Sequence, residues 1–188
     1  MAFHWLRNLL PRISRTQRRK AVRVHSLGIA GLEDRTLLTM TSAISVGANT
    51  TPVQAVASDV NGDGNNDLIE LTASTSSVSV LLSNGDGTYQ APIVSLAGGA
   101  GKNMVVRDFD HDGKLDVAVN IGSSVDLLHG HGDGNFDLPQ YYYLGAYAND
   151  IEVGDFNEDG FDDVATASFS YGGTTQLLMN SGTGTFLP

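Results

Sequence analysis

Short apolar runs alternate with polar, glycine-rich stretches along the chain beyond residue 40. The runs favour valine, isoleucine, threonine and aromatic residues, as in "LIELTAS", "VAVNIG" and "VATASFS". Clusters of glycine, asparagine and aspartate separate them, and this pattern predicts strands and not helices. No run approaches the roughly 18 apolar residues that a membrane-spanning helix needs. The pattern therefore predicts an all-β fold.

The pattern occurs three times, with a period of almost fifty residues. Each copy opens on an acidic loop, and the loops begin at Asp59, Asp108 and Asp155, which are 49 and 47 residues apart. Two apolar runs, a glycine-rich turn and a proline follow in every copy. Four short antiparallel strands in about fifty residues are typical of one β-propeller blade. The expected four-stranded, blade-like repeats span about residues 42–96, 97–144 and 145–188.

Three blades are fewer than the four to eight that usually close a propeller. An open arc exposes apolar faces and strand edges. The segment "TSAISVG" before the first loop matches the last strand of later units, and the third unit stops at Pro188 without that strand. We therefore expect a partial β-propeller, either the open front of a longer chain or one completed by association of copies.

The three acidic loops read "DVNGDGNNDL", "DFDHDGKLDV" and "DFNEDGFDDV". Aspartates at this spacing repel one another, so a bound cation is expected. Oxygen-bearing side chains recur at positions 1, 3, 5 and 9, and a glycine at position 6 permits a sharp turn. Ca²⁺ prefers six to eight oxygen ligands in adaptable geometry. The pattern predicts one Ca²⁺ in each loop, about three ions in all.

The predicted ligands follow from these loop positions. The side-chain ligands are Asp59, Asn61, Asp63 and Asp67 in the first loop, Asp108, Asp110, Asp112 and Asp116 in the second, and Asp155, Asn157, Asp159 and Asp163 in the third. The backbone carbonyls predicted at position 7 belong to Asn65, Lys114 and Phe161. Water or bidentate aspartate supplies the remaining ligands.

The first loop also satisfies the EF-hand pattern, from Asp59 to an acid at position 12, Glu70. Position 12 is Val119 in the second copy and Thr166 in the third. The flanks alternate like strands, where an EF-hand needs helices. We therefore exclude an EF-hand and leave Glu70 out of the site.

The acidic loops and the turns "GDGTY", "GDGNF" and "GTGTF" together resemble the FG-GAP, or VCBS, repeat family. The resemblance covers essentially residues 42–188. It implies integrin-like propeller blades with a Ca²⁺ loop between their first two strands. The function it implies is a noncatalytic extracellular module for adhesion or surface protein interaction. A glycan-binding propeller and a noncatalytic fragment of a larger exported enzyme remain alternatives.

Charge is distributed unevenly along the chain. Residues 1–40 hold eight of the eleven Lys and Arg residues and two acids, which leaves a formal charge of −16 for residues 41–188. So acidic a domain lacks the basic patch that nucleic acid requires. The chain contains no cysteine, which excludes disulfides and thiolate sites. The sequence contains no recognisable active-site motif, so we expect that this protein is not an enzyme.

Residues 1–40 form a basic tail with a weak apolar segment, a partial match to a secretory signal. The segment "LEDRTLLT", Leu32 to Thr39, resembles one found near the N-terminus of many large exported bacterial proteins. The resemblance implies an extracellular or cell-surface location, and a disordered basic arm is the alternative. A reporter fused to residues 1–42 tests this expectation, because cytoplasmic retention of the fusion contradicts export.

Two further features lie outside the acidic loops. His129 and His131 in "HGHGD" stand beside Asp133, so a transition-metal site is an alternative to a glycine-rich turn, which we favour. The run Tyr141 to Tyr143 predicts a strand whose alternate rings pack against neighbouring blades. The alternative is that Tyr141 and Tyr143 are exposed for a sugar or a partner.

Overall fold

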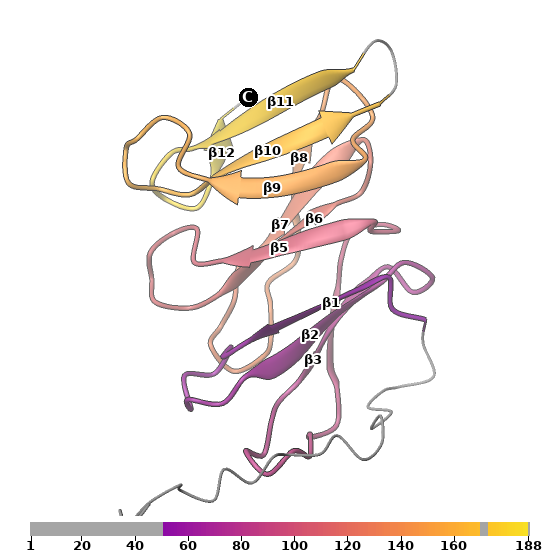
Figure 1. The fold of residues 1–188 in the computed structure, drawn as a ribbon, viewed down its shortest axis with the longest axis vertical. Helices are drawn as coiled ribbons and strands as arrows, with labels where there is room; N and C mark the ends of the chain where they lie inside the picture. Colours follow the sequence, from indigo (N-terminus) through magenta and orange to yellow (C-terminus); the bar gives the residue numbers. More distant parts are fainter. Residues whose placement is uncertain (1–50, 170–172, 188) are drawn as a thin grey trace, which may run out of the picture. The chain divides into compact units, whose positions relative to one another are not determined.

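Every regular element of the described residues is a β-strand (Figure 1). The computed structural model describes residues 51–169 and 173–187, so the basic tail and the strand predicted in residues 41–47 lie outside it. The described part has no helix long and apolar enough to cross a membrane. The strands are β1 (Gln54–Ser58), β2 (Asp67–Thr72), β3 (Ser77–Leu81), β4 (Ile93–Leu96), β5 (Asn103–Arg107), β6 (Asp116–Asn120), β7 (Ser124–Leu128), β8 (Gln140–Tyr143), β9 (Asp150–Gly154), β10 (Asp163–Ser168), β11 (Thr174–Asn180) and β12 (Phe186–Leu187).

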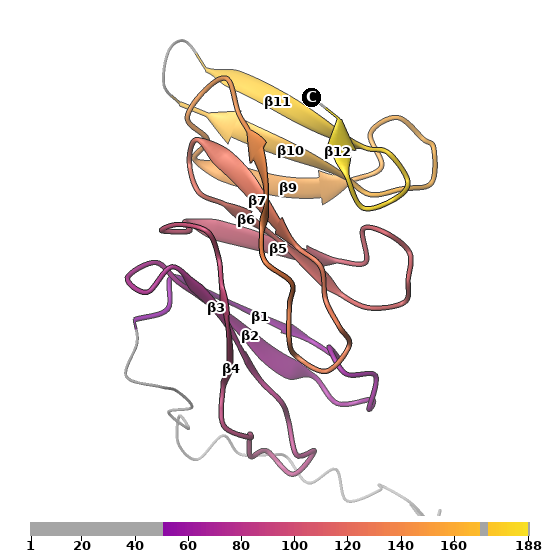
Figure 2. The same ribbon diagram turned by 180° about the vertical axis from the view of Figure 1, so that it is seen from behind.

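The strands form three four-stranded antiparallel sheets, each in the order of the sequence. The sheets comprise β1–β4, β5–β8 and β9–β12, one for each repeat. Figure 2 shows the outer strands β4 and β12 from behind. The predicted all-β architecture of three blade-like sheets is confirmed.

In the first two sheets the middle strands are buried on both faces, whereas in the outer strands of the first sheet partly buried and exposed positions alternate. All five residues of β6 are buried, and so are all five of β3. In β1 and β4 partly buried and exposed residues alternate. Successive side chains of a strand point to opposite sides of the sheet. A strand whose sheet is covered on both faces therefore has consecutive apolar residues in its sequence.

Two apolar clusters fill the spaces between consecutive sheets. The first combines Ile69 and Val80 of the first sheet with Val117 and Val119 of the second. The second combines the intervening Ala118 with residues of the third sheet. Alternate residues of β6 thus belong to different clusters, as the two-residue period of a strand requires.

Polar side chains link the first strands of the three sheets. Gln54 in β1 accepts a hydrogen bond from the Met104 N–H at 2.6 Å and donates one to the Met104 carbonyl at 3.1 Å. Asn103 in β5 donates to the Asp150 carboxylate of β9 at 2.6 Å. Figure 1 shows β1, β5 and β9 following one another. The links fix the register between blades.

In the second and third blades, the aromatic residue after the glycine-rich turn packs against the preceding blade. Phe136 of the second blade belongs to the cluster that contains Val60 of the first. Phe186 of the third blade packs edge to face on Phe109 of the second, with 5.4 Å between the ring centroids. The residue equivalent to Val60 and Phe109 in the third blade, Phe156, is 47% exposed.

Candidate metal centre

The acidic loops connect the first and second strands of each sheet. Ser58 pairs with Asp67, Arg107 with Asp116, and Gly154 with Asp163. Each pair closes the mouth of one loop, so loop positions 1 and 9 lie close to each other. Figure 1 shows all three loops on the left, at the same end of the sheets.

The aspartate at position 9 is buried in every loop and hydrogen-bonded through both oxygens. Asp116 accepts the N–H of Phe109 at 2.9 Å and the N–H of Gly130 at 2.8 Å. The same two bonds recur from Asp67 to Val60 and Ser83, and from Asp163 to Phe156 and Asn180. This residue therefore ties the acidic loop to the glycine-rich turn. Its role as a metal ligand stays a prediction, and each oxygen keeps a second lone pair for it.

The carboxylate at position 1 organises the tip of each loop. Asp108 accepts the N–H of Asp112 at 3.1 Å and the N–H of Gly113 at 2.9 Å. Asp59 and Asp155 accept the same two N–H groups in their loops. The glycine at position 6 has φ between +86° and +92° in the three loops, a left-handed conformation that favours glycine. This glycine lets the chain turn so that its N–H groups face the carboxylate.

Position 3 makes the second loop chemically different. Asn61 donates its amide N–H to Asp63 at 3.0 Å, and Asn157 donates to Asp159 at 2.9 Å. Asp110 has no such donor, and in its loop the ammonium of Lys114 binds Asp112 at 2.8 Å instead. That hydrogen bond is the main cause that lowers the pKa of Asp112. Burial raises the pKa of Asp110, and the charges of Asp116 and Asp112 raise it further.

The oxygen atoms of the second loop converge as a cation site requires. One carboxylate oxygen each from Asp108, Asp110 and Asp112 lies within 4.8 Å of the others. Hard oxygen donors on a tight, adaptable loop fit the chemistry of Ca²⁺. When bound, Ca²⁺ supplies two positive charges that offset the repulsion between these carboxylates.

Position 7 contributes its backbone N–H to the loop. The N–H of Lys114 donates to Asp112 at 2.8 Å, and Asn65 and Phe161 do the same in their loops. Coordination by the three carbonyls stays a prediction.

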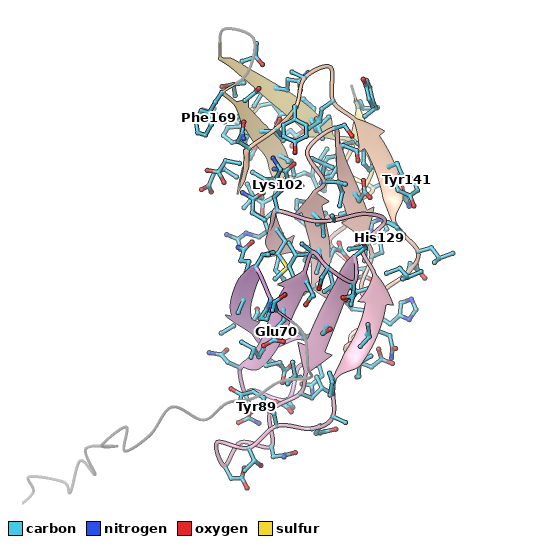
Figure 3. All side chains as sticks on the ribbon, turned by 90° about the vertical axis from the view of Figure 1, so that its right-hand side faces the viewer. Glu70, Tyr89, Lys102, His129, Tyr141 and Phe169 are labelled. Atoms are coloured by element: carbon cyan, nitrogen blue, oxygen red, sulfur yellow. The ribbon has the colours of Figure 1, made fainter. Side chains whose placement is uncertain are left out.

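The two neighbouring histidines face different partners. His131 lies 2.9 Å from the carboxylate of Asp137, measured from Nε2. His129, labelled in Figure 3, directs Nδ1 toward Asp116 and Asp110, at 3.5 and 3.7 Å. The structure does not combine them with Asp133 into one site. In the sequence His129 stands directly before Gly130, whose backbone N–H donates to Asp116. This position brings the imidazole next to the second acidic loop.

Glu70 lies outside the first loop, in the second strand (Figure 3). It is buried, and burial raises its pKa. The first loop is flanked by strands β1 and β2. The exclusion of an EF-hand is confirmed.

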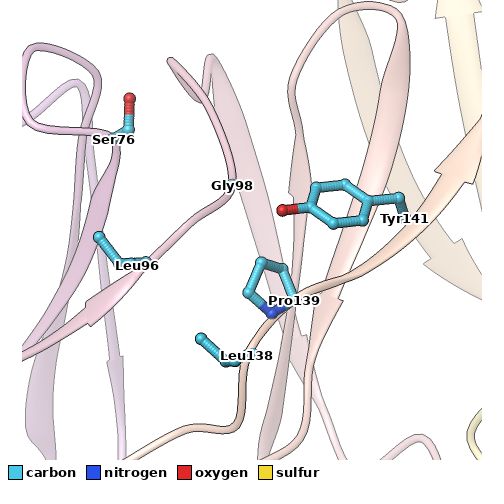
Figure 4. Close-up of a pocket in the computed structure, with 6 residues that line it drawn as sticks. All are labelled: Ser76, Leu96, Gly98, Leu138, Pro139 and Tyr141. Atoms are coloured by element: carbon cyan, nitrogen blue, oxygen red, sulfur yellow. The ribbon is translucent and has the colours of Figure 1, made fainter.

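A pocket of about 370 Å³ lies between the first two blades (Figure 4). Its lining residues are Ser76, Leu96, Gly98, Leu138, Pro139 and Tyr141. Tyr141 and Tyr143 are 66% and 80% exposed, whereas Tyr142 packs on Phe186 with 5.1 Å between ring centroids. The predicted strand is confirmed, but only its middle ring packs inward, and Tyr141 and Tyr143 are exposed as the alternative expected. The exposed ring of Tyr141 borders the pocket.

Asp126 is a buried carboxylate behind this pocket. Its Oδ1 accepts the Ser124 hydroxyl at 2.8 Å, while Oδ2 finds no hydrogen-bond partner among the described residues. A Cβ atom at Gly98 would lie 2.1 Å from Oδ2, so this position requires glycine. Burial raises the pKa of Asp126 from 3.8 to about 6, although the Ser124 bond opposes the shift.

Asp126→Asn is expected to stabilise the protein at alkaline pH. The native state binds the proton more tightly than the unfolded state, so the stabilisation from Asp126 is complete below pH 3.8 and is lost as the pH rises through about 6. We expect the free energy of unfolding to rise by about 2–3 kcal/mol at pH 8, with the gain vanishing near pH 4. Urea unfolding at both pH values measures this, with the exposed Glu152→Gln as control. An equal effect at both pH values would contradict the prediction.

Known proteins agree with this architecture. The fold and the loops define a protein built of β-propeller blades. A family model of the FG-GAP-like repeat matches residues 59–119 and 108–166, and the chain belongs to this family. No curated protein matches the chain significantly.

Two solved structures share the fold at low sequence identity. One is the Tc holotoxin pore of Photorhabdus luminescens, with a TM-score of 0.55 and 16% identity over 74% of this chain and 7% of that one. The other is an Agrocybe aegerita lectin that recognises non-reducing terminal N-acetylglucosamine, with a TM-score of 0.51 and 23% identity over 72% of this chain and 36% of that one. The match thus spans well under two thirds of either protein.

Proposed function

We propose that this chain is a noncatalytic, Ca²⁺-binding FG-GAP repeat module that acts outside the cell by binding a macromolecule at a surface. The observation that carries the proposal is the convergence of three carboxylates within 4.8 Å in the second loop. In the other two loops the aspartate at position 1 accepts hydrogen bonds from the same two backbone N–H groups, those of positions 5 and 6. The ions are structural: they hold the acidic loops in their folded shape.

Addition of Ca²⁺ is expected to raise the melting temperature of the full chain. With dissociation constants of about 10⁻⁴ to 10⁻³ M, as in extracellular modules, 10 mM Ca²⁺ stabilises each site by about 1.4–2.7 kcal/mol. Circular dichroism melts in chelator and in 10 mM Ca²⁺ measure the shift. Mg²⁺ at equal concentration is expected to do less, because it demands a stricter octahedron.

A matched variant ties this response to the loops. Replacing position 5 in all three loops (Asp63→Ala, Asp112→Ala, Asp159→Ala) removes an exposed carboxylate from each site. We expect the Ca²⁺-dependent shift to disappear while the β spectrum in chelator is retained. A melt of the unaltered chain that does not respond to Ca²⁺ would refute the structural role of the ions.

Export and surface interaction complete the proposal. The basic N-terminal segment, which contains "LEDRTLLT", supports export, and the acidic repeat domain that follows supports a role outside the cell. Association of copies through exposed blade faces belongs to the same proposal, since Phe156 is 47% exposed.

Glycan binding is a second candidate function. The pocket beside Tyr141 offers an exposed aromatic ring next to Leu138 and Pro139, a surface suited to the apolar face of a sugar. The fold shared with a lectin supports this candidate.

Glycan binding is expected to depend on Tyr141 and not on Tyr143. A glycan array that includes terminal N-acetylglucosamine should show at least about tenfold weaker binding for Tyr141→Ala. An aromatic ring that the bound glycan covers contributes more than about 1 kcal/mol to the free energy of binding. Tyr143→Ala is the control, since Tyr143 is exposed on the same strand but does not line the pocket. Absence of any bound glycan, or equal losses in both variants, rules this candidate out.

A further inference from the structure

The imidazole of His129 lies against the second acidic loop. Its Nδ1 is buried and finds no hydrogen-bond partner in the described part of the chain. The atom is 3.5 Å from Oδ1 of Asp116 and 3.7 Å from Oδ2 of Asp110, and the three ligand atoms lie within 4.8 Å of one another. Two carboxylates and one imidazole thus meet at one point.

This combination belongs to the second blade. The residue directly before the N–H donor to position 9 is His129 here, Leu82 in the first blade and Met179 in the third. Position 3 differs in the same way, because Asn61 and Asn157 replace Asp110. At positions 1, 3, 5 and 9 the second loop therefore has four carboxylates where each of the others has three, and a nitrogen donor lies beside them.

The third blade closes over this cluster. A Cβ atom at Gly184 would lie 2.6 Å from Cε1 of His129 and 2.7 Å from Cβ of Asp110. The side chains of His129 and Asp110 keep 17% and 27% exposure, which leaves a route for a small ion. The cluster is thus enclosed but accessible.

We propose that Asp110, Asp116 and His129 bind one divalent transition-metal ion of the Zn²⁺ type. Zn²⁺ takes nitrogen and carboxylate ligands at about 2.0–2.2 Å, with three protein ligands and a water at open sites. Tetrahedral geometry at these lengths separates ligand atoms by about 3.3 Å, close to the two distances from Nδ1. Imidazole suits transition metals, whereas Ca²⁺ prefers oxygen. The two ions exclude each other in this loop, because both need Asp110 and Asp116.

Co²⁺ is the probe for this site, because its visible absorption reports coordination geometry and ligand type. Titration of the full chain should give a tetrahedral-type band that saturates at one equivalent and is displaced by Zn²⁺. His129→Leu, which installs the first blade's residue, should weaken Co²⁺ binding at least about tenfold, since even loss of an outer-shell partner weakens metal binding 10–100-fold. His131→Ala should leave the titration unchanged.

The outcomes separate this site from the proposed Ca²⁺ function. His129→Leu keeps every predicted Ca²⁺ ligand, so its melt in Ca²⁺ should shift as in the unaltered chain, which also shows that it folds. His129→Met, with the third blade's residue, repeats the test in a second background. A band that survives both variants, or the absence of a saturable band in the unaltered chain, overturns the proposal whether or not Ca²⁺ stabilises the protein.

Discussion

In chelator, Asp116→Ala is expected to lower the free energy of unfolding by about 3–5 kcal/mol. The substitution leaves the N–H groups of Phe109 and Gly130 without their acceptor, and each unsatisfied buried donor costs about 1–3 kcal/mol. Loss of contact between loop and turn adds to this cost. Urea unfolding of the full chain by circular dichroism measures the change.

Asp112→Ala is the matched control within the same loop. Asp112 is exposed, and its partners in Lys114 can bind water instead. We expect a loss of about 1 kcal/mol or less in chelator, together with a weaker response to Ca²⁺. Equal losses for the two variants in chelator would mean that position 9 does not brace the fold.

Phe109→Ala is expected to destabilise the protein by about 3–5 kcal/mol. The ring is fully buried and packs edge to face on Phe186 of the third blade. Its removal leaves a cavity between the second and third blades that neighbouring side chains fill only in part. Thermal or urea unfolding measures the loss.

Phe156→Ala tests the same position in the third blade. Because Phe156 is 47% exposed, we expect a loss below about 1 kcal/mol at low protein concentration. If copies associate through this face, the loss should grow with protein concentration. A loss as large as that for Phe109→Ala in a dilute monomer would contradict the burial difference between the two rings.

The blades could be predicted because the sequence repeats its physical cues at a fixed spacing. Glycine at position 6 of each loop, alternating apolar runs and the final turn act locally, so they determine strands and turns without knowledge of distant contacts. The EF-hand alternative was excluded on the same local grounds, since strands flank the first loop.

The three repeats, the all-β fold and the acidic loops follow from the amino-acid sequence alone, because they depend on neighbouring residues. Which members of an equivalent set are buried depends instead on contacts between distant parts of the chain. Phe109 and Phe156 occupy the same loop position, yet one ring is buried by the next blade and the other is not. Likewise the approach of His129 to Asp110 depends on the pairing of distant strands, and a linear pattern does not specify that distance.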